Sequence, residues 1–254
     1  MRVGLIGLGA IGRGVVSLLD PSDRIEIVGA VVRDASKPRG EAMPRICSSL
    51  PELLEQRPEV VVEAGGHAAL ACHGPTVLRA GIDLIMVSVG AMADPAVERE
   101  LVEAARAGDS QAIIASGAIG ALDAIASAAV GGLDRVTHTT RKPAAALLAA
   151  DQTLDGPREL FRGSAREGAI RFPESINVAA AVSLAGLGLD RTEVCVIADP
   201  TVQRNQHEVV AEGRFGELRF EIRNIPTDNP RTGRLVAMSI VHTLRRRRAA
   251  LVVS

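Results

Sequence analysis

The sequence predicts an α/β fold: a Rossmann-type doubly wound parallel sheet, then a second α+β domain, then a C-terminal helix that returns to the first domain. Three observations support this prediction. An apolar run of strand length leads straight into a glycine-rich turn at residues 7–12. Apolar strands and helices then alternate to about residue 120, and in the second domain the strands from residue 192 onward follow one another without helices between them. We expect the first domain to span 1–120 with 230–254, and the second 121–229.

The glycine-rich turn has the order of residues that a dinucleotide site requires. Gly7 permits a tight turn, Gly9 lets the backbone approach a pyrophosphate, and Gly12 lets the helix pack closely on the strand. The N–H groups at the start of that helix favour a negatively charged ligand. An ordinary structural turn is the alternative, and the strand before and the helix after it favour the nucleotide. We therefore expect NAD or NADP to bind at Gly7, Gly9, Ala10, Ile11 and Gly12.

The second predicted strand, 24–32, ends at Arg33 and Asp34. In a nucleotide-binding fold this junction meets the adenosine ribose. A carboxylate there accepts hydrogen bonds from the ribose hydroxyls, whereas an arginine pairs with a 2′-phosphate. Because both residues are present, the sequence leaves the choice between NAD and NADP open.

The rest of the first domain continues the alternation of strands and helices. Small residues follow three of its strands, at Gly65, Gly90 and Gly117. Ligands of open parallel sheets lie outside the carboxyl ends of the strands, so we expect a shared cofactor crevice there, although turn chemistry also explains single glycines. The expected elements are a helix at 48–57, a strand at 59–64, a helix at 68–80, a strand at 82–88, a helix at 95–107 and a strand at 111–116.

The second domain is predicted from less regular patterns, and the last helix from its cap. Asn229 is a good N-cap and Pro230 suits the first helical position of a helix that runs to about Arg248. The unpaired N–H groups behind this cap form an anion site. The other expected elements are a helix at 122–130, a strand at 135–142, helices at 165–172 and 177–187, a strand at 192–198, and a hairpin of 208–211 and 217–224.

Composition excludes several classes of partner. The 254 residues carry a net charge of -1 and 2% aromatic residues, which argues against a nucleic-acid partner, and we interpret the arginines at 245–248 as a solvated helix end. The three cysteines are far apart, so neither a disulfide framework nor a metal site is expected, and a cytoplasmic location fits. No apolar run reaches the roughly 18 residues of a membrane span.

Motifs along nearly the whole chain resemble those of the L-aspartate dehydrogenase family. The resemblance implies a catalytic domain whose sheet mediates a homodimer. It also implies NAD(P)-dependent oxidation of L-aspartate to iminoaspartate or, after hydrolysis, oxaloacetate and ammonia. The motifs, in the order of the family, are GLGAIG, VEAGGHAAL, HGPTVLRAGIDLIMVSVGA, ASGAIGALDAI, TTRKP, GSAREGAIRFPESINVAAAVSLAGLGLD, ADP, NQHEVVAEGRFGE and NPRTG.

The resemblance also implies roles for individual residues. His207 stands at the position of the family's catalytic histidine, and Ala118 and Asn177 stand at positions that contact the cofactor. Two departures lie in the last motif, where Arg231 and Gly233 replace the Lys and Ser that the family often has.

The chemistry requires a group that titrates near neutrality, first for the amine proton and then for the water that hydrolyses the imine. Of the four other histidines, surface or capping roles suffice for His73 and His242. His67 follows a predicted Rossmann strand, where it could touch the cofactor, and His138 lies within a strand, where a packed and a functional role both stay open. The two carboxylates of aspartate need fixed donors, and each candidate has a surface or capping alternative. These candidates are Arg141, Lys142, Asn229 and Thr232.

Two other functions stay open at this point. One is a related two-domain reductase of another small carboxylate or semialdehyde, similar to homoserine dehydrogenase or dihydrodipicolinate reductase. The other is a non-catalytic NAD(P)-binding sensor, which the presence of His207 disfavours.

Overall fold

The computed structural model describes residues 1–37, 43–148, 153–172, 176–225 and 233–253. The chain divides into two compact units. One consists of Met1–Gly117 with Val236–Ser254, and the other of Ala118–Leu235. The last helix therefore returns to the unit in which the chain begins.

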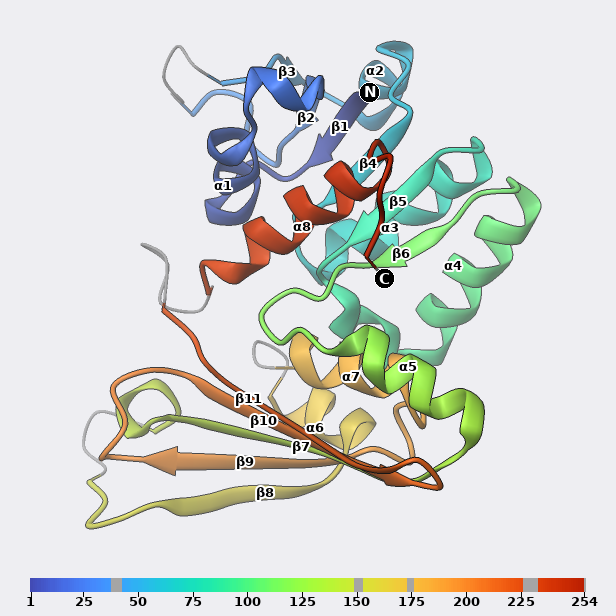
Figure 1. Ribbon diagram of the computed structural model, residues 1–254. Coiled ribbons are helices and arrows are strands. Elements are labelled where there is room, and N and C mark those ends of the chain that lie inside the picture. Colours follow the sequence, from blue (N-terminus) through green and yellow to red (C-terminus); the bar gives the residue numbers. More distant parts are fainter. Residues whose placement is uncertain (38–42, 149–152, 173–175, 226–232, 254) are drawn as a thin grey trace. The chain divides into compact units, whose positions relative to one another are not determined.

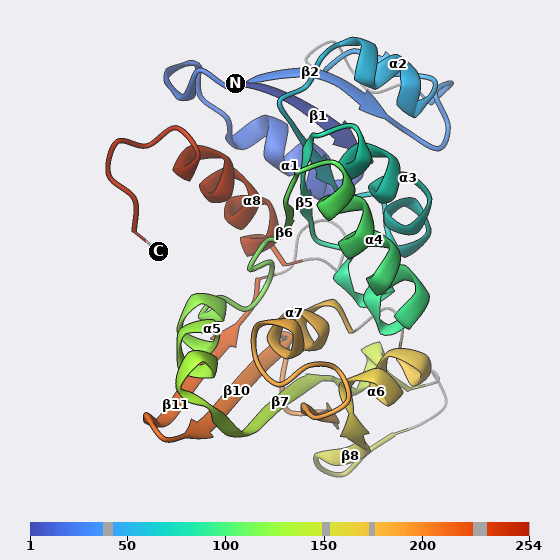
Figure 2. The same cartoon turned by 90° about the vertical axis from the view of Figure 1, so that its right-hand side faces the viewer.

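The first unit is built on a parallel sheet with the strand order β3-β2-β1-β4-β5-β6. Helices cover both faces: α1 and α8 lie on one, and α3 and α4 on the other (Figures 1 and 2). A sheet covered in this way needs apolar side chains on both faces, and Val60, Val61 and Val62 of the central β4 are fully buried. Order and layers together confirm the predicted Rossmann-type sheet. Its strands are β1 (Arg2–Ile6), β2 (Glu26–Val31), β3 (Ile46–Cys47), β4 (Val60–Glu63), β5 (Asp83–Met86) and β6 (Ala112–Ile114).

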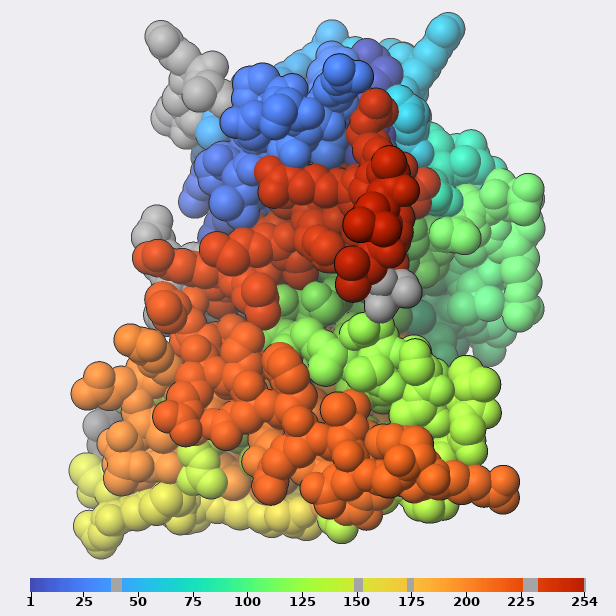
Figure 3. Space-filling view, viewed as in Figure 1, coloured from blue at the N-terminus to red at the C-terminus, as the bar shows by residue number. Residues whose placement is uncertain are grey.

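The C-terminal helix completes this unit as predicted. The α8 helix packs so closely on α1 that a Cβ on Gly14 would lie 2.9 Å from the Cβ of Ala237. In Figure 3 the blue atoms of the N-terminal part adjoin the red atoms of the C-terminal part. Two arginines of the basic run are not simply solvated, because Arg245 pairs with Asp23 at 2.6 Å and Arg247 pairs with Asp83. The helices of the unit are α1 (Ala10–Leu18), α2 (Leu50–Glu55), α3 (His67–Arg79), α4 (Pro95–Ala107) and α8 (Leu235–Arg246), with short 3₁₀ turns at Pro21–Asp23 and Val89–Ala93.

The second unit is a mixed sheet with helices on one face. Its strand order is β11-β10-β7-β9-β8, in which only the β7–β9 pair is parallel. The α5, α6 and α7 helices lie on one face of this sheet (Figure 1). This confirms the predicted α+β domain. The elements are α5 (Leu122–Gly131), β7 (Leu133–Pro143), a 3₁₀ turn (Ala144–Ala146), β8 (Arg158–Ser164), α6 (Ala165–Arg171), α7 (Asn177–Ala185), β9 (Glu193–Asp199), β10 (Gln206–Gly213) and β11 (Gly216–Arg223).

The two faces of this second sheet differ in polarity. The helix-covered face holds the apolar core, in which Val136 and Val209 from the sheet pack with Val182 of α7. The opposite face carries charged side chains that pair with each other, such as Arg141 with Asp199 at 2.7 Å. Because side chains alternate along a strand, successive residues of these strands face the apolar core and the charged face in turn.

Three local predictions differ from the structure. The hairpin of β10 and β11 closes through two residues between Gly213 and Gly216, not five, because the pairing continues to that last pair. The polar edge strand β8 was not predicted. The predicted helix start at Pro230 lies outside the described residues, but the predicted helix is absent at 233–234, because Arg234 N donates to Ile225 O and α8 begins at Leu235.

Among the helices of the described ranges, none combines the length and the apolar character that crossing a membrane requires.

Candidate functional site

The fold itself requires two of the three glycines in the turn between β1 and α1, and the third leaves open space. Gly7 has φ +94°, and a Cβ there would lie 2.6 Å from Ala64 O, while a Cβ on Gly12 would overlap the carbonyl oxygen of Gly7. Gly9 is different, because a Cβ on it would meet nothing within 4 Å. The protein itself therefore requires Gly7 and Gly12, whereas the space beside Gly9 is available to a ligand. Ala10 begins the helix that follows.

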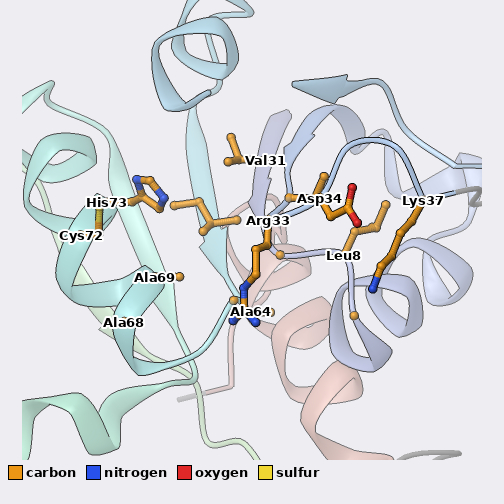
Figure 4. A pocket seen from close by; sticks show the side chains of 15 residues that line it. Leu8, Val31, Arg33, Asp34, Lys37, Ala64, Ala68, Ala69, Cys72 and His73 are labelled. Atoms are coloured by element: carbon orange, nitrogen blue, oxygen red, sulfur yellow. The ribbon is translucent and has the colours of Figure 1, made fainter. Parts of the chain in front are cut away.

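A cavity of about 520 Å³ opens beside this turn, at the carboxyl ends of β1, β2 and β4 (Figure 4). It combines open space, glycine backbone and the N-terminus of α1, which fits a dinucleotide pyrophosphate. Of the three glycines predicted to lie at strand ends, Gly65 lines this cavity, whereas Gly90 and Gly117 do not belong to its described lining. The lining residues are Ile6, Gly7, Leu8, Gly9, Val31, Val32, Arg33, Asp34, Lys37, Ala64, Gly65, Ala68, Ala69, Cys72 and His73.

Arg33 and Asp34 both line the cavity, but their side chains are placed differently. Arg33 extends along the cavity toward Ala64 (Figure 4). Asp34 closes a local turn, because its Oδ1 accepts hydrogen bonds from Ser36 N at 3.0 Å and Ser36 Oγ at 2.6 Å. Lys37 adds a second cation to the lining that sequence reasoning missed.

A buried carboxylate supports the turn between β4 and α3. Glu63 is fully buried and accepts hydrogen bonds from Gly65 N at 2.8 Å and Gly66 N at 2.9 Å. It also accepts from Ser88 N at 3.1 Å and Ser88 Oγ at 2.9 Å. Burial raises the pKa of this carboxyl, and the four donors act in the opposite direction. Sequence reasoning missed Glu63 because it ends an otherwise apolar strand.

In the second unit, His207 forms a buried pair with His138. On β10 and β7 the two are diagonal neighbours on one sheet face, because His207 pairs with Thr140 and His138 with Val209. His138 Nε2 lies 3.2 Å from His207 Nδ1, and the ring planes are within 17° of parallel. His138 is fully buried and His207 is 5% exposed. The sequence left a packed and a functional role open for His138, and the pair with His207 could not be predicted from it.

The low pKa of His207 has two causes. Burial is the larger one, and the positive charge of Lys142 adds to it, so that the pKa falls to about 4. Burial, then His207, then Lys142 hold the pKa of His138 well below its usual range. Both imidazoles are therefore neutral at pH 7, so His207 can accept a proton, but its pKa lies below the titration near neutrality that the chemistry led us to expect.

Arg141 and Lys142 take opposite faces of β7. Lys142 shares the alternation of His138 and Thr140, which face the helices. Arg141 lies on the other face, where it pairs with Asp199. The structure thus places Lys142 on the sheet face that carries the His207 side chain, while Arg141, on the other face, lines a smaller cavity that His207 also borders.

The other predicted residues are spread along the second unit. Ala118 lies in the turn after β6, and its carbonyl oxygen accepts a hydrogen bond from Asn224 Nδ2 at 3.0 Å. Asn177 is the first residue of α7. Asn229 and Thr232 lie outside the described residues.

Comparison with known proteins decides the family. A family model described as "Aspartate dehydrogenase, C-terminal" matches residues 123–247, and one described as "Homoserine dehydrogenase, NAD binding domain" matches 7–115. An L-aspartate dehydrogenase of Ruegeria pomeroyi is 43% identical, over 99% of this chain and 94% of the relative. The chain belongs to the L-aspartate dehydrogenase family.

Further relatives agree with the family. L-aspartate dehydrogenase 2 of Bordetella bronchiseptica is 39% identical over 99% of this chain and 98% of its own. The crystal structure of aspartate dehydrogenase from Thermotoga maritima matches with a TM-score of 0.85 and 26% identity, covering 100% of this chain and 99% of that one. This chain is thus an oxidoreductase of the L-aspartate dehydrogenase family, and its first unit is an NAD(P)-binding domain.

Arg33 is expected to favour NADP. In Arg33→Met the loss of a charge-assisted bond to the 2′-phosphate should weaken NADP binding by about 1–3 kcal/mol and NAD binding much less. Titration of the variant with both cofactors measures this, and NAD serves as the internal control. Equal losses for the two cofactors would show that Arg33 does not meet the 2′-phosphate.

Proposed function

We propose that this chain catalyses the reversible, NAD(P)-dependent oxidative deamination of L-aspartate to iminoaspartate and, after hydrolysis, to oxaloacetate and ammonia. The relatives named L-aspartate dehydrogenase over nearly the full chain support the substrate. The observation that carries the mechanism is the burial of His207 against His138, and burial together with the charge of Lys142 lowers the pKa of His207 to about 4.

The chain's own residues have separate tasks in this proposal. The bound nicotinamide supplies the acceptor for the hydride that leaves Cα. The turn at Gly7, Gly9 and Gly12 holds the pyrophosphate, with Ala118 and Asn177 as further cofactor contacts. His207 Nε2 takes a proton from the substrate amine and releases it to solvent; it then takes one from the water that hydrolyses the imine and passes it to the departing ammonia. In the reverse direction the same atom returns these protons.

Lys142 provides charge for a substrate carboxylate in this proposal. We expect Lys142→Met to raise the KM for L-aspartate by roughly 10–100-fold, the effect of losing one hydrogen bond to a charged group. Arg141→Met is the matched control, because it removes the neighbouring cation on the opposite face of β7. Initial rates over a range of L-aspartate concentrations measure both. A larger KM increase in Arg141→Met would assign the carboxylate to Arg141 instead.

The pH dependence of the reaction follows from the pKa of about 4. The base form of His207 is lost as the pH falls through this pKa, so kcat/KM, which reports the free enzyme, should keep its acid limb far below pH 6.5. The substrate carboxylates oppose the charge of Lys142 and favour the imidazolium, so the limb in kcat should lie at higher pH. Rate profiles between pH 4 and 8 measure both limbs. If kcat/KM and kcat both had their acid limb near pH 6.5, the low pKa of His207 would be contradicted.

We also propose a cytoplasmic homodimer. The family resemblance supports pairing through the sheet of the second unit, and the free thiols of Cys47, Cys72 and Cys195 suit a reducing compartment. Sedimentation of the purified chain at the monomer mass would contradict the dimer.

A further inference from the structure

We propose that His138 is a positioning residue, which accepts a hydrogen bond from His207 Nδ1–H and thereby keeps His207 Nε2 unprotonated for the substrate. This inference rests on the proposed role of His207 as the base. It assigns a function to a buried histidine that touches neither substrate nor cofactor in the proposed mechanism.

Only one proton can lie between the two facing nitrogens of the His138 and His207 rings. With His138 Nε2 and His207 Nδ1 at 3.2 Å, one nitrogen donates and the other accepts. If His138 donated, the neutral His207 would carry its proton on Nε2 and could not act as a base. If His138 accepts, the proton of His207 is on Nδ1, and Nε2 presents its lone pair.

Only the accepting arrangement serves both protonation states of His207. When Nε2 takes the amine proton, the amine loses one N–H bond and His207 becomes an imidazolium, while the Nδ1 proton stays where it was. That Nδ1–H still donates to His138 Nε2, so no second proton moves. The relation resembles that between the histidine and aspartate of a serine protease triad, with a neutral partner instead of a carboxylate.

The surroundings of His138 keep it neutral, and in the accepting arrangement its own proton lies on Nδ1 as a buried N–H. His138 is fully buried, and its Nδ1 atom has no hydrogen-bond partner among the described residues in either tautomer. Burial, the neighbouring titratable His207 and the positive charge of Lys142 hold the pKa of His138 far below its usual range. The positive charge therefore stays on His207, the ring nearer to solvent, and is not passed inward.

The fold fixes this geometry. The register of β7 against β10 places Thr140 opposite His207 and Val209 opposite His138, which makes the two histidines diagonal neighbours. Their ring centroids are 5.4 Å apart with nearly parallel planes. Rotation of the His207 ring would break both the ring contact and the hydrogen bond.

The direct test is NMR of the full-length protein with ¹⁵N-labelled histidine at pH 7. His207→Gln assigns the His207 signals by their disappearance. We expect protonated Nδ1 and unprotonated Nε2 on His207. A His207 ring protonated at Nε2 would overturn the inference, and this result requires no His138 variant to fold.

Two variants test the consequence for the reaction. His138→Phe keeps a ring but offers no acceptor, so we expect kcat for L-aspartate to fall about tenfold, the equivalent of one hydrogen bond, with little change in NAD(P) affinity. The acid limb of kcat should move to lower pH, because the imidazolium loses its acceptor. His138→Gln places an amide oxygen near the position of Nε2 and should restore both kcat and the position of its acid limb.

These outcomes separate the inference from the proposed function. If His207→Gln destroys turnover but His138→Phe and His138→Gln have equal kcat and the parental acid limb, His138 is structural and only the inference fails. If His207→Gln retains turnover, the proposed base itself is wrong. A fall in melting temperature shared by both His138 variants, without a shift of the limb, would likewise show a structural role alone.

Discussion

Replacing His207 with alanine is expected to lower turnover of L-aspartate by roughly 10²–10⁴-fold, the usual contribution of a positioned acid or base. NAD(P) affinity should be retained, because the glycine turn and the cavity beside it belong to the first unit. Steady-state rates with saturating cofactor measure the loss, and a cofactor titration by fluorescence checks that binding survives.

The controls for this variant address stability. Removing the His207 ring leaves His138 Nε2 buried without its partner, which costs about 1–3 kcal/mol of unfolding free energy. His207→Gln keeps a polar group at this position, and His242→Ala removes an exposed histidine of α8. Rates should be low in both His207 variants and parental in His242→Ala. If His207→Ala kept most of the activity, the base would have to be sought at His67 or Lys142.

The Gly9→Val variant is expected to fold normally and to lose cofactor. Its φ of -79° is open to any residue, and a Cβ there meets no protein atom within 4 Å, so the melting temperature should be close to that of the parent. The added methyl groups occupy the side from which a pyrophosphate would approach the backbone. Loss of at least one charge-assisted hydrogen bond corresponds to a roughly 10–100-fold weaker Kd for NAD(P).

Two other glycines give the contrast for Gly9→Val. In Gly7→Val the side chain collides with Ala64 O and the backbone has φ +94°, so that variant should lose stability as well as binding. Gly156→Val, in the second unit and with nothing within 4 Å of its Cβ, should change neither. Calorimetric titration and thermal melting of the three variants measure both properties. Parental NAD(P) affinity in Gly9→Val would place the pyrophosphate elsewhere.

A helix whose first turn carries a clear capping residue could be predicted to the exact residue. The α4 helix spans Pro95–Ala107 as expected, because Asp94 caps its first turn and Pro95 fits the first position. The edge strand β8 has no such pattern. Its side chains are partly exposed, and Arg162 holds Glu159 and Glu193 in ion pairs, so it lacks the apolar alternation by which strands are recognised.

The candidate site likewise has one part that the sequence predicts and another that it does not. The glycine turn is local, and its sequence therefore predicts its geometry. The partner of His207 is set by the register of two strands about 70 residues apart, which no local pattern reveals. Alternation alone predicts that Arg141 and Lys142 face opposite ways, but which of them shares the face of His207 depends on where the helices pack.

The measurement that tests the central claim most directly is the initial rate of NAD(P)H formation, followed by absorbance, with a panel of substrates. The panel contains L-aspartate and L-homoserine, and dihydrodipicolinate is assayed in the reductive direction. The account predicts NAD(P)H formation with L-aspartate at a kcat/KM far above that for the others, and loss of that rate in His207→Ala. A higher kcat/KM for homoserine or dihydrodipicolinate, or cofactor binding without turnover of any of them, would contradict it.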